Sequence, residues 1–344
     1  MDRPTVCAQL NVHPNDIGYV PVLLPHQVRA WAPQVERIHV TLDTHGAVAG
    51  HYKAVDMEAK LARMRETLAA IAADEPKLVI DEVDPSPEAR ARVARQWFGR
   101  DDMPLKAWNG SPIYAYLFGM SATGADQVVH FDGDMLFGGG STDWVAEALD
   151  VLHEEDDCAF VSPLSGPPHP DGELIGQGEH WKDTRFGPIE GRERAYRFNT
   201  VSTRIFLTSI TLLKERLGGP VPMRAPGLKE WLFAALLENP RETIELERML
   251  AEAMAASGLC RIDMLGSAPG MWTLHPPYRS DEFYARLPEL VHRVETGDLP
   301  EGQLGRYDLG APLIDWSEVA RQKSRANRWK QHAHHVAGRL NPLR

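Results

Sequence analysis

Two aspartates separated by one glycine, Asp132 and Asp134, are the residues of this sequence best suited to chemistry. They follow the apolar run "VVHF" and stand where a buried parallel strand would end, which is where ligands gather in open α/β sheets. Two carboxylates at such an edge repel each other and lose solvation unless a cation joins them. Their oxygens suit Mg²⁺ or Mn²⁺ bound together with substrate phosphates. Asp-Gly-Asp also occurs as a plain turn, so the prediction depends on the preceding strand.

Glycines surround this pair. Gly133 removes a side chain between the two aspartates, so that another group can approach the backbone there. Three more glycines occupy positions 138 to 140. They either let a loop lie close to a ligand or form a simple tight turn, and both interpretations stay open.

The elements that must position the aspartates alternate along the first half of the chain. Strand patterns cover residues 5–12, 35–43, 77–83 and 126–132, and helical patterns cover 56–74, 86–98, 111–124 and 141–155. Residues 20–33 predict a loop that leads into a short helix. Ser86 is expected to cap its helix with Pro87 at the first position, and Ser141 or Thr142 to cap the last one. Strands separated by helices predict a largely parallel sheet with helices on both faces.

The second half of the chain is less regular. Its patterns predict a loop at 162–181, a strand or hairpin at 195–209, helices at 227–239 and 243–258, a strand at 258–266 and a loop at 267–283. The last 24 residues contain seven Arg or Lys and no acidic side chain. Such a tail is typically a solvated or flexible end, and the alternative is a weak contact with a membrane surface or a partner.

Composition excludes several classes of function. The formal net charge of −11 argues against nucleic-acid binding, because phosphate neutralisation needs a basic face. The three scattered cysteines form neither a disulfide framework nor a CxxC metal site, which fits a reducing compartment. The first residues lack the apolar segment of a secretory signal, and no apolar run approaches the roughly 20 residues that span a bilayer. We therefore expect a cytoplasmic protein, with a peripheral position at the membrane as the alternative.

These features occur in an order that resembles the GT-A class of nucleotide-sugar-dependent glycosyltransferases, most closely the family 2 type. Four segments over about residues 5–280 carry the likeness: "VTLDTHG", "WNGSPIYAYLFGMSATGADQVVHFDGDM", "ELERMLAEAMAASGLCRIDMLG" and "WTLHPPYR". The resemblance implies a GT-A (Rossmann-like) fold, an α/β architecture with a mixed, mostly parallel sheet flanked by helices. Residues 1–280 would form this domain, with a nucleotide-sugar half at about 1–140 and an acceptor half at about 141–280. Residues 281–344 would form a helical C-terminal extension with the basic tail.

The resemblance also implies a metal site. Asp134, together with Asp132, would hold Mn²⁺ or Mg²⁺ against the two phosphates of a nucleoside-diphosphate sugar. His275 would be the third ligand, in a loop that the two following prolines stiffen. The cation would act as a Lewis acid that stabilises the charge on the departing diphosphate. A lone histidine in a loop is more often polar surface, which is the alternative for His275.

Further residues would contact the donor by the same resemblance. Asp43, at the end of the second strand, matches the aspartate that typically contacts the nucleoside. Lys106 and Asn109 precede the DxD strand, in the region that usually lines the donor pocket. Arg279 is suited to a phosphate oxygen because its planar fork matches that geometry, and a surface salt bridge is the alternative.

The catalytic base is the least regular part of the resemblance. The usual Glu-Asp pair is absent, and counting back from Gly258 places Glu247 at the position of the base and Leu246 at that of its partner. Glu247 is therefore the candidate general base and Glu245 the second choice. Acidic residues in the first turn of a helix also favour its dipole without any chemistry. Inversion is expected if attack is a direct in-line displacement, and a retaining GT-A transferase is the alternative.

The sequence therefore predicts a metal-dependent glycosyltransferase that acts on a glycan, lipid-linked or small-molecule acceptor. A nucleotidyltransferase would need a Gly-rich phosphate loop with a basic residue after the first strand, which "NVHPNDIG" does not supply. A non-catalytic nucleotide- or carbohydrate-binding protein on the same scaffold is the alternative of another class. It would keep the fold and the metal, and Glu247→Gln would leave its behaviour unchanged.

Overall fold

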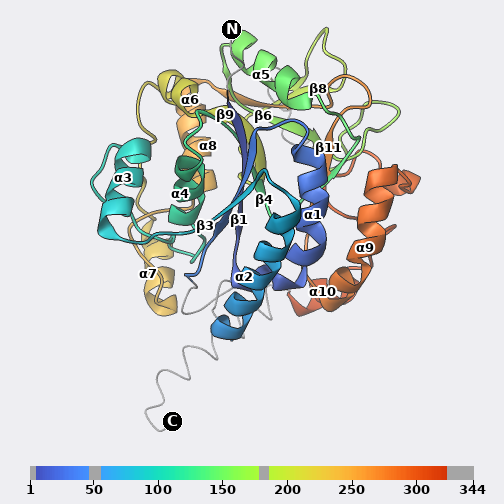
Figure 1. Ribbon diagram of the computed structural model, residues 1–344. Coiled ribbons are helices and arrows are strands. Elements are labelled where there is room, and N and C mark those ends of the chain that lie inside the picture. Colours follow the sequence, from blue (N-terminus) through green and yellow to red (C-terminus); the bar gives the residue numbers. More distant parts are fainter. Residues whose placement is uncertain (1–4, 46–55, 178–185, 324–344) are drawn as a thin grey trace.

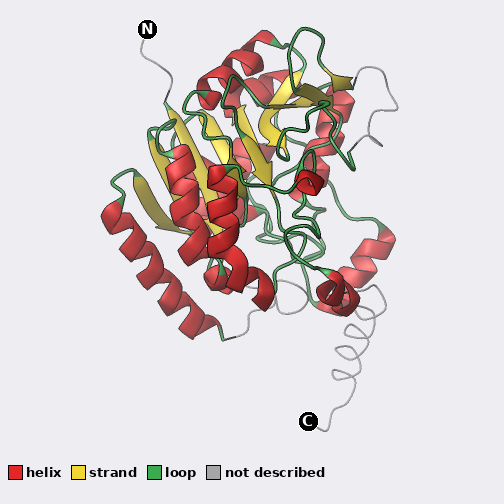
Figure 2. Cartoon of the chain, turned by 90° about the vertical axis from the view of Figure 1, so that its right-hand side faces the viewer, coloured by secondary structure: helices red, strands yellow, loops and turns green. Residues whose placement is uncertain are grey.

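The computed structural model describes residues 5–45, 56–177 and 186–323. One mixed sheet runs through the molecule in the order β3-β2-β1-β4-β9-β6-β10-β8-β7, and the short strands β5 and β11 join it beside β6. Figure 1 views this sheet nearly edge-on, with α3, α4, α6 and α8 on one side and α1, α2 and α9 on the other. Figure 2 shows the same layers after a quarter turn. The expected α/β class, a mixed sheet with a parallel core and flanking helices, is confirmed.

The first half of the chain builds the parallel part of the sheet. Its strands are β1 (Val6–Val12), β2 (Arg37–Leu42), β3 (Leu78–Glu82) and β4 (Gln127–Asp132), and all their mutual pairings are parallel. Its helices are α1 (Val20–Trp31), α2 (Met57–Asp74), α3 (Pro87–Phe98) and α4 (Tyr114–Ala122), with a 3-10 turn η1 (Pro14–Gly18) after β1. Ser86 caps α3 as predicted, because its side chain accepts from the Ala89 amide at 3.3 Å. Helix α1 begins directly at Val20, where a loop was expected.

The second half differs more from the prediction. Its strands are β5 (Leu136–Gly138), β6 (Cys158–Ser165), β7 (Gly187–Pro188), β8 (Ala195–Phe198), β9 (Ile205–Ser209), β10 (Cys260–Met264) and β11 (Trp272–Leu274). The segment 195–209 forms two strands but not a hairpin, because β6 and β10 separate β8 from β9. Strand β9 runs antiparallel between β4 and β6. The segments expected to be loops, 162–181 and 267–283, contribute the end of β6 and all of β11.

The helices of the second half are α5 (Trp144–Glu154), α6 (Ile210–Leu217), α7 (Leu228–Leu237), α8 (Leu246–Ser257), α9 (Asp281–Thr296) and α10 (Ser317–Gln322), with a 3-10 turn η3 (Glu301–Gln303). The predicted cap of α5 is wrong, since Asp143 is its N-cap residue and Ser141 accepts from the Asp143 amide instead. Phe283 and Leu287 on α9 are buried in the same core as β1. The extension after residue 280 thus packs against the main core, and the proposed division there stays a prediction. The basic tail beyond residue 323 lies outside the described residues.

The glycines after the aspartate pair serve packing between strands. A Cβ on Gly138 would lie 2.0 Å from the Trp272 ring, and one on Gly139 would lie 2.3 Å from the Gly270 oxygen. Strand β5 pairs with β11 at this place, with Gly138 opposite Trp272. The close approach that these two glycines permit is therefore to β11 and to the loop just before it.

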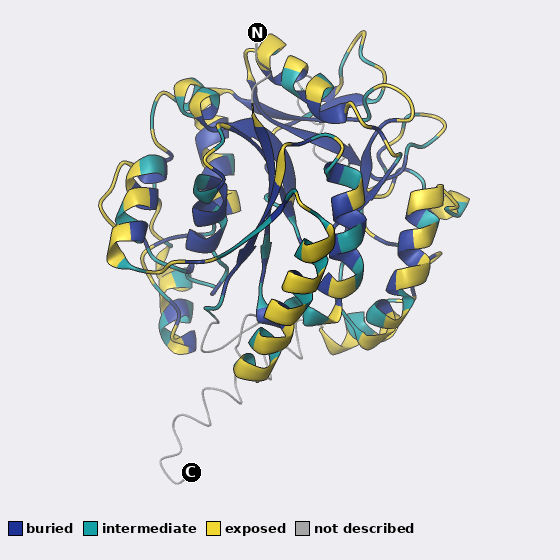
Figure 3. Cartoon of the chain, viewed as in Figure 1, coloured by how far each residue is buried: buried dark blue, intermediate teal, exposed yellow. Residues whose placement is uncertain are grey.

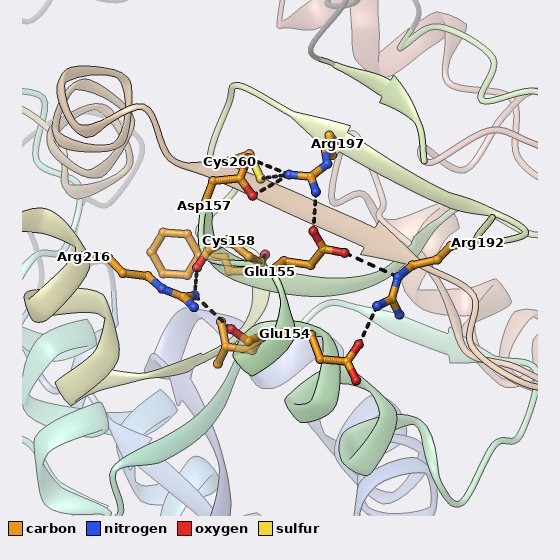
Figure 4. A network of polar contacts seen from close by, with 10 residues as sticks. Glu154, Glu155, Asp157, Cys158, Arg192, Arg197, Arg216 and Cys260 are labelled. Carbon is orange, nitrogen blue, oxygen red and sulfur yellow. Dashed lines mark hydrogen bonds and ion pairs between the residues drawn. The ribbon is translucent and has the colours of Figure 1, made fainter. Parts of the chain in front are cut away.

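Buried side chains fill both faces of the sheet, whereas the outer sides of the helices are exposed (Figure 3). A network of ion pairs closes the amino ends of β6 and β10, where Arg197 contacts Glu155 and Asp157, and Arg192 contacts Glu154 (Figure 4). Because β4, β6 and β10 share one direction, this network lies at the opposite end of the sheet from the carboxyl end of β4. Among the described residues, no helix is both long and apolar enough to cross a membrane.

Candidate functional site

A pocket of about 430 Å³ lies at the carboxyl ends of β1, β2 and β4. The parallel register brings these ends together, since Asn11 of β1 pairs with Asp132 of β4 and Val12 of β1 pairs with Leu42 of β2. The residue after each strand therefore faces the same space. The charged side chains that line the pocket are Asp16, Asp43, Lys60, Lys106, Asp132, Asp134, Arg279 and Lys323. Five of these were predicted from the sequence, and the structure brings those five into one pocket.

A buried ion pair forms one wall of the pocket. Lys106 Nζ donates to Asp43 Oδ2 at 2.6 Å, and both side chains are less than a tenth exposed. The His45 amide donates to the other oxygen of Asp43 at 2.9 Å. Burial raises the pKa of Asp43, but hydrogen bonding with His45 and the Lys106 ammonium lower the pKa to about 2. This wall therefore presents a fixed carboxylate with its own cation.

The pKa of Asp132 is shifted in the opposite direction from that of Asp43. Burial and then the Asp134 carboxylate raise the pKa of Asp132 to about 7. The Tyr116 hydroxyl donates to Asp132 Oδ1 and lowers that pKa in part. A carboxyl group with a pKa near neutrality binds a proton or a cation readily, because either one relieves the cost of burying its charge.

Asp134 is fully buried beside this group. One of its oxygens, Oδ2, accepts from Arg279 Nη2, whereas Oδ1 is buried and has no hydrogen-bond partner within the described residues. The Gln27 side chain holds the backbone on either side, donating to the carbonyls of Gly133 and Met135 at 2.9 Å each. The loop that carries Asp134 is thus fixed, and one carboxylate oxygen is left for a further ligand.

The donor set fits a divalent cation that also binds a substrate. Two neighbouring carboxylates, one with an orphaned oxygen and one with a raised pKa, are oxygen ligands of the kind that Mg²⁺ and Mn²⁺ use together with phosphates. A shell made by the protein alone is not assembled: within the described ranges, no group of three His, Cys, Asp or Glu side chains is arranged to hold a metal ion. His275 Nδ1 bonds instead to Asp308 at 2.9 Å, and its ring stacks on Tyr307. The role of His275 as a ligand stays a prediction.

The remaining predicted residues lie outside the pocket lining. Asn109 Nδ2 donates to Glu245 Oε1 at 2.9 Å, and Glu245 is the N-cap residue of α8. Glu247 is exposed and accepts from both the amide and the hydroxyl of Thr203, at 3.0 and 3.2 Å. These contacts connect the start of α8 to the segments before α4 and β9, and they leave the assignment of either glutamate as the base untested.

Sequence reasoning missed part of the pocket wall. The segment after β1 places His13 and Asp16 in the pocket, where burial lowers the pKa of His13 to about 4 and raises the pKa of Asp16 to about 6. The signal was the polar run "HPND" directly after an apolar strand, at the same sheet edge as the aspartates. Lys60 comes from helix α2 and Lys323 follows the end of α10, and neither segment contains a motif that points to a ligand.

Comparisons with known proteins are distant. No protein-family model matches the sequence, and no curated protein matches it. Similar solved structures include the galactosyltransferase LgtC in complex with donor and acceptor sugar analogs, at 12% identity, covering 87% of this chain and 98% of that chain with a TM-score of 0.36. The mannosyltransferase PcManGT from Pyrobaculum calidifontis, in complex with GDP-Man and Mn²⁺, is 13% identical, covering 98% of this chain and 75% of that chain with a TM-score of 0.39.

A third similar structure is S. aureus TarS 1-349 in complex with UDP-GlcNAc, at 11% identity, covering 96% of this chain and 79% of that chain with a TM-score of 0.38. LgtC and PcManGT are glycosyltransferases by name, the class that the sequence resembles.

Proposed function

We propose that this protein is a metal-dependent glycosyltransferase that moves a hexosyl group from a nucleoside-diphosphate sugar to an acceptor nucleophile. The observation that carries the proposal is the neighbouring pair of half-buried Asp132 and buried Asp134 at the rim of the sheet, with one oxygen of Asp134 unpartnered among the described residues. A pocket of about 430 Å³ lies in front of this pair and contains cations that match a diphosphate. Its size is within the range of small-molecule sites.

Different charged residues of the pocket suit different parts of the donor, the nucleoside and the two phosphates. The fixed carboxylate of Asp43, with Lys106 behind it, suits hydrogen-bond donors of a nucleoside. Arg279, Lys60 and Lys323 supply positive charge for the two phosphates. Arg279 is placed for this because its guanidinium already bonds Asp134 and lies over the Tyr19 ring at 5.8 Å. The donor would thus be oriented by this chain before any chemistry takes place.

Asp132 and Asp134 would hold Mn²⁺ or Mg²⁺ together with the phosphates, and His275 is the proposed further ligand. The bound cation would supply Lewis-acid stabilisation of the departing diphosphate. Asp132 must lose its proton for this role, and the Tyr116 hydrogen bond to Asp132 Oδ1 favours that deprotonated form. Asn109 would act indirectly, through Glu245.

Glu247 remains the proposed general base, and Glu245 is the second choice. Thr203 fixes Oε2 of Glu247 with two hydrogen bonds, so that the other carboxylate oxygen can accept a proton from an acceptor hydroxyl. Direct in-line attack would invert the anomeric configuration, and a retaining transferase is the alternative outcome. The acceptor is a glycan, a lipid-linked sugar or a small molecule.

Thermal unfolding with a panel of nucleotides tests the donor site. Mn²⁺ together with UDP or GDP, at 100 times the dissociation constant, should raise the free energy of unfolding by about 2.7 kcal/mol. The variant Asp134→Ala should lose the metal-dependent part of this gain. The exposed Asp171→Ala, away from the pocket lining, is the matched control and should keep all of it.

Two results would contradict the proposal. If no nucleoside diphosphate stabilises the protein with either metal, the pocket is not a donor site. If Asp134→Ala binds the nucleotide with unchanged metal dependence, the role given to this carboxylate is wrong. Release of nucleoside diphosphate from a nucleotide-sugar then separates an enzyme from a binding protein, because the latter would bind the donor without turnover.

A further inference from the structure

Helix α7 exposes a stripe of large apolar side chains. Leu228 is 77% exposed, Trp231 41% and Leu232 50%. These positions follow the i, i+3, i+4 spacing that places side chains on one side of a helix. Leu236, 48% exposed, continues the stripe, and among the described residues these four are the exposed large apolar side chains. We call Leu228, Trp231 and Leu232 the α7 stripe.

This exposure is unusual for such a helix. The opposite side of α7 is buried through Ala234 and Leu237, so the helix is apolar on both its inner and outer sides. A helix that is apolar all round is normally buried. Figure 3 shows buried and exposed residues together on α7. Contiguous exposed apolar side chains mark interaction surfaces in soluble proteins.

The chain segment after α7 contacts a loop that lines the proposed donor pocket. The residues that follow α7 contact the loop before α4: the Trp108 amide donates to the Thr243 carbonyl at 3.1 Å, and Asn109 donates to Glu245. Lys106 of the same loop lines the pocket. In Figure 1, α7 and α10 both lie toward the end of the sheet where β1 terminates. The strongly basic C-terminal sequence, with its seven Arg or Lys and no acidic residue, begins at Arg321 in α10.

The size of the stripe argues against a second copy of the chain as its occupant. A helix of ten residues is about 15 Å long, and one exposed side of it offers roughly 150 to 300 Å². A stable protein interface buries about 800 Å² on each partner. A lipid surface has no such minimum, since an interfacial helix inserts only its apolar side among the headgroups.

We propose that α7 inserts into the surface of an anionic lipid bilayer and that the basic C-terminal sequence supplies the second, electrostatic contact. Trp231 suits the boundary between lipid headgroups and acyl chains, because its ring is apolar with a polar edge. Arg241 lies over that ring at 4.8 Å, and the exposed Lys229 lies next to the stripe, so both can meet lipid phosphates. Glu238 and Glu242 follow the helix and offset these cations, so apolar contact supplies most of the α7 contribution. A single weak membrane contact gives only marginal attachment, whereas an apolar contact combined with a basic one gives stable binding.

Cosedimentation of the full chain with vesicles tests this proposal. We expect binding to phosphatidylcholine vesicles that contain phosphatidylglycerol. The variant Leu228→Ser/Leu232→Ser should lower the partition coefficient about tenfold, which is about 1.4 kcal/mol. The control Ala69→Ser/Ala70→Ser changes exposed residues of α2 and should bind as the unaltered chain does. The single variant Leu228→Ser, at the most exposed position, keeps the test valid if the double variant unfolds.

Salt separates the two contacts, because screening weakens electrostatic attraction and leaves apolar insertion largely intact. Removal of residues 324–344 should lower mainly the salt-dependent part of binding, and the α7 variants should lower mainly the salt-independent part. Three outcomes would overturn the proposal: no vesicle binding, vesicle binding that the α7 variants leave unchanged, or a dimer of the unaltered chain that these variants dissociate. The nucleotide-dependent thermal shift is a separate readout, so failure of the donor site and failure of lipid binding are distinguishable.

Discussion

The two halves of the sheet use their polar residues differently. In the parallel half, β1, β2 and β4 end at one edge, and residues at or just after their ends, including Asp132 and Asp43, line one pocket. In the mixed half, the antiparallel β9 lies between β4 and β6, and the predicted residues Glu245, Glu247 and His275 lie outside that lining. Parallel strands deliver their carboxyl ends to a common edge whatever the helices between them do. Mixed strands give no such guarantee.

The two halves also differ in whether acids with a raised pKa line the pocket. In the parallel half, burial raises the pKa of Asp132 to about 7 and the pKa of Asp16 to about 6. Such groups destabilise the protein as pH rises, because the folded state holds a proton that the unfolded state releases. In the mixed half, burial also raises the pKa of Asp263, but Ser165 and Arg261 bond its carboxyl group and it lies outside the pocket lining. Acids with a raised pKa in a pocket are candidates for function, which is why the proposal centres on the parallel half.

The largest expected effect comes from the buried aspartate pair. Asp134→Ala removes the carboxylate with the orphaned oxygen and should reduce sugar transfer by on the order of 10³- to 10⁴-fold, since metal stabilisation of the leaving group contributes several kcal/mol. The measurement is the initial rate of nucleoside diphosphate release from a nucleotide-sugar. Asp308→Asn, in the mixed half, should have a smaller effect because it acts only through His275. Equal losses in both variants would show that the two halves form one metal site.

The next largest expected effect is on stability and comes from the buried ion pair of the parallel half. Lys106→Met leaves the buried Asp43 without its cation and should lower the free energy of unfolding by about 3 kcal/mol, as expected for half of a buried ion pair. Urea unfolding measures this loss. The double variant Lys106→Met/Asp43→Asn should recover part of it, because no unpaired charge remains. If the double variant is as unstable as the sum of the single variants, the pair does not interact.

The third effect concerns the mixed half. If Glu247 is the base, Glu247→Gln should lower the rate about 10²-fold, at the low end of general-base catalysis. Donor binding should be unchanged, because Glu247 lies outside the donor pocket lining. The control Glu245→Gln keeps an oxygen that can accept the hydrogen bond from Asn109, so it should lower the rate less. A reversed order of the two losses would transfer the role of base to Glu245, and two normal rates would exclude both.

Sequence reasoning reached the parallel half because its signals are local. An apolar strand followed by acidic residues identifies Asp132 and Asp134, whereas Asp43 was predicted from the resemblance to GT-A glycosyltransferases. Parallel topology then brings the three carboxylates to one edge of the sheet. The polar run after β1 carried the same signal for His13 and Asp16. Lys60 and Lys323 could not be found this way, because a lysine on a helix faces a pocket only through packing between distant segments.

In the mixed half, tertiary pairing overrides the local pattern. Residues 195–209 alternate as a hairpin would, yet β8 pairs with β10, and β9 fills the space between β4 and β6. Strand β11 has only three residues and is stabilised by its pairing with β5 and β6. It is too short for an alternating pattern to predict it. His275 stays a predicted ligand for the same reason: its position depends on these non-local pairings, which a local pattern does not indicate.

The smallest expected effect is a change in acid stability within the parallel half. Burial lowers the pKa of His13 from 6.5 to about 4, although Asp43 raises it in part. The unfolded chain therefore binds a proton first as pH falls, so the contribution of His13 to stability is complete above pH 6.5 and is lost toward pH 4. By about pH 5 the loss should be about 2 kcal/mol, at 1.36 kcal/mol for each pKa unit.

His13→Asn isolates this contribution. An asparagine at the N-cap of η1 can still accept from the Asn15 amide, as His13 Nδ1 does at 3.1 Å, but it does not titrate. Urea unfolding between pH 7 and about pH 5 should therefore show a shallower loss in the variant, by about one bound proton. An identical pH dependence in both proteins would mean that His13 is solvated in the folded state, and that the pocket wall after β1 is more open than the buried wall formed by Asp43 and Lys106.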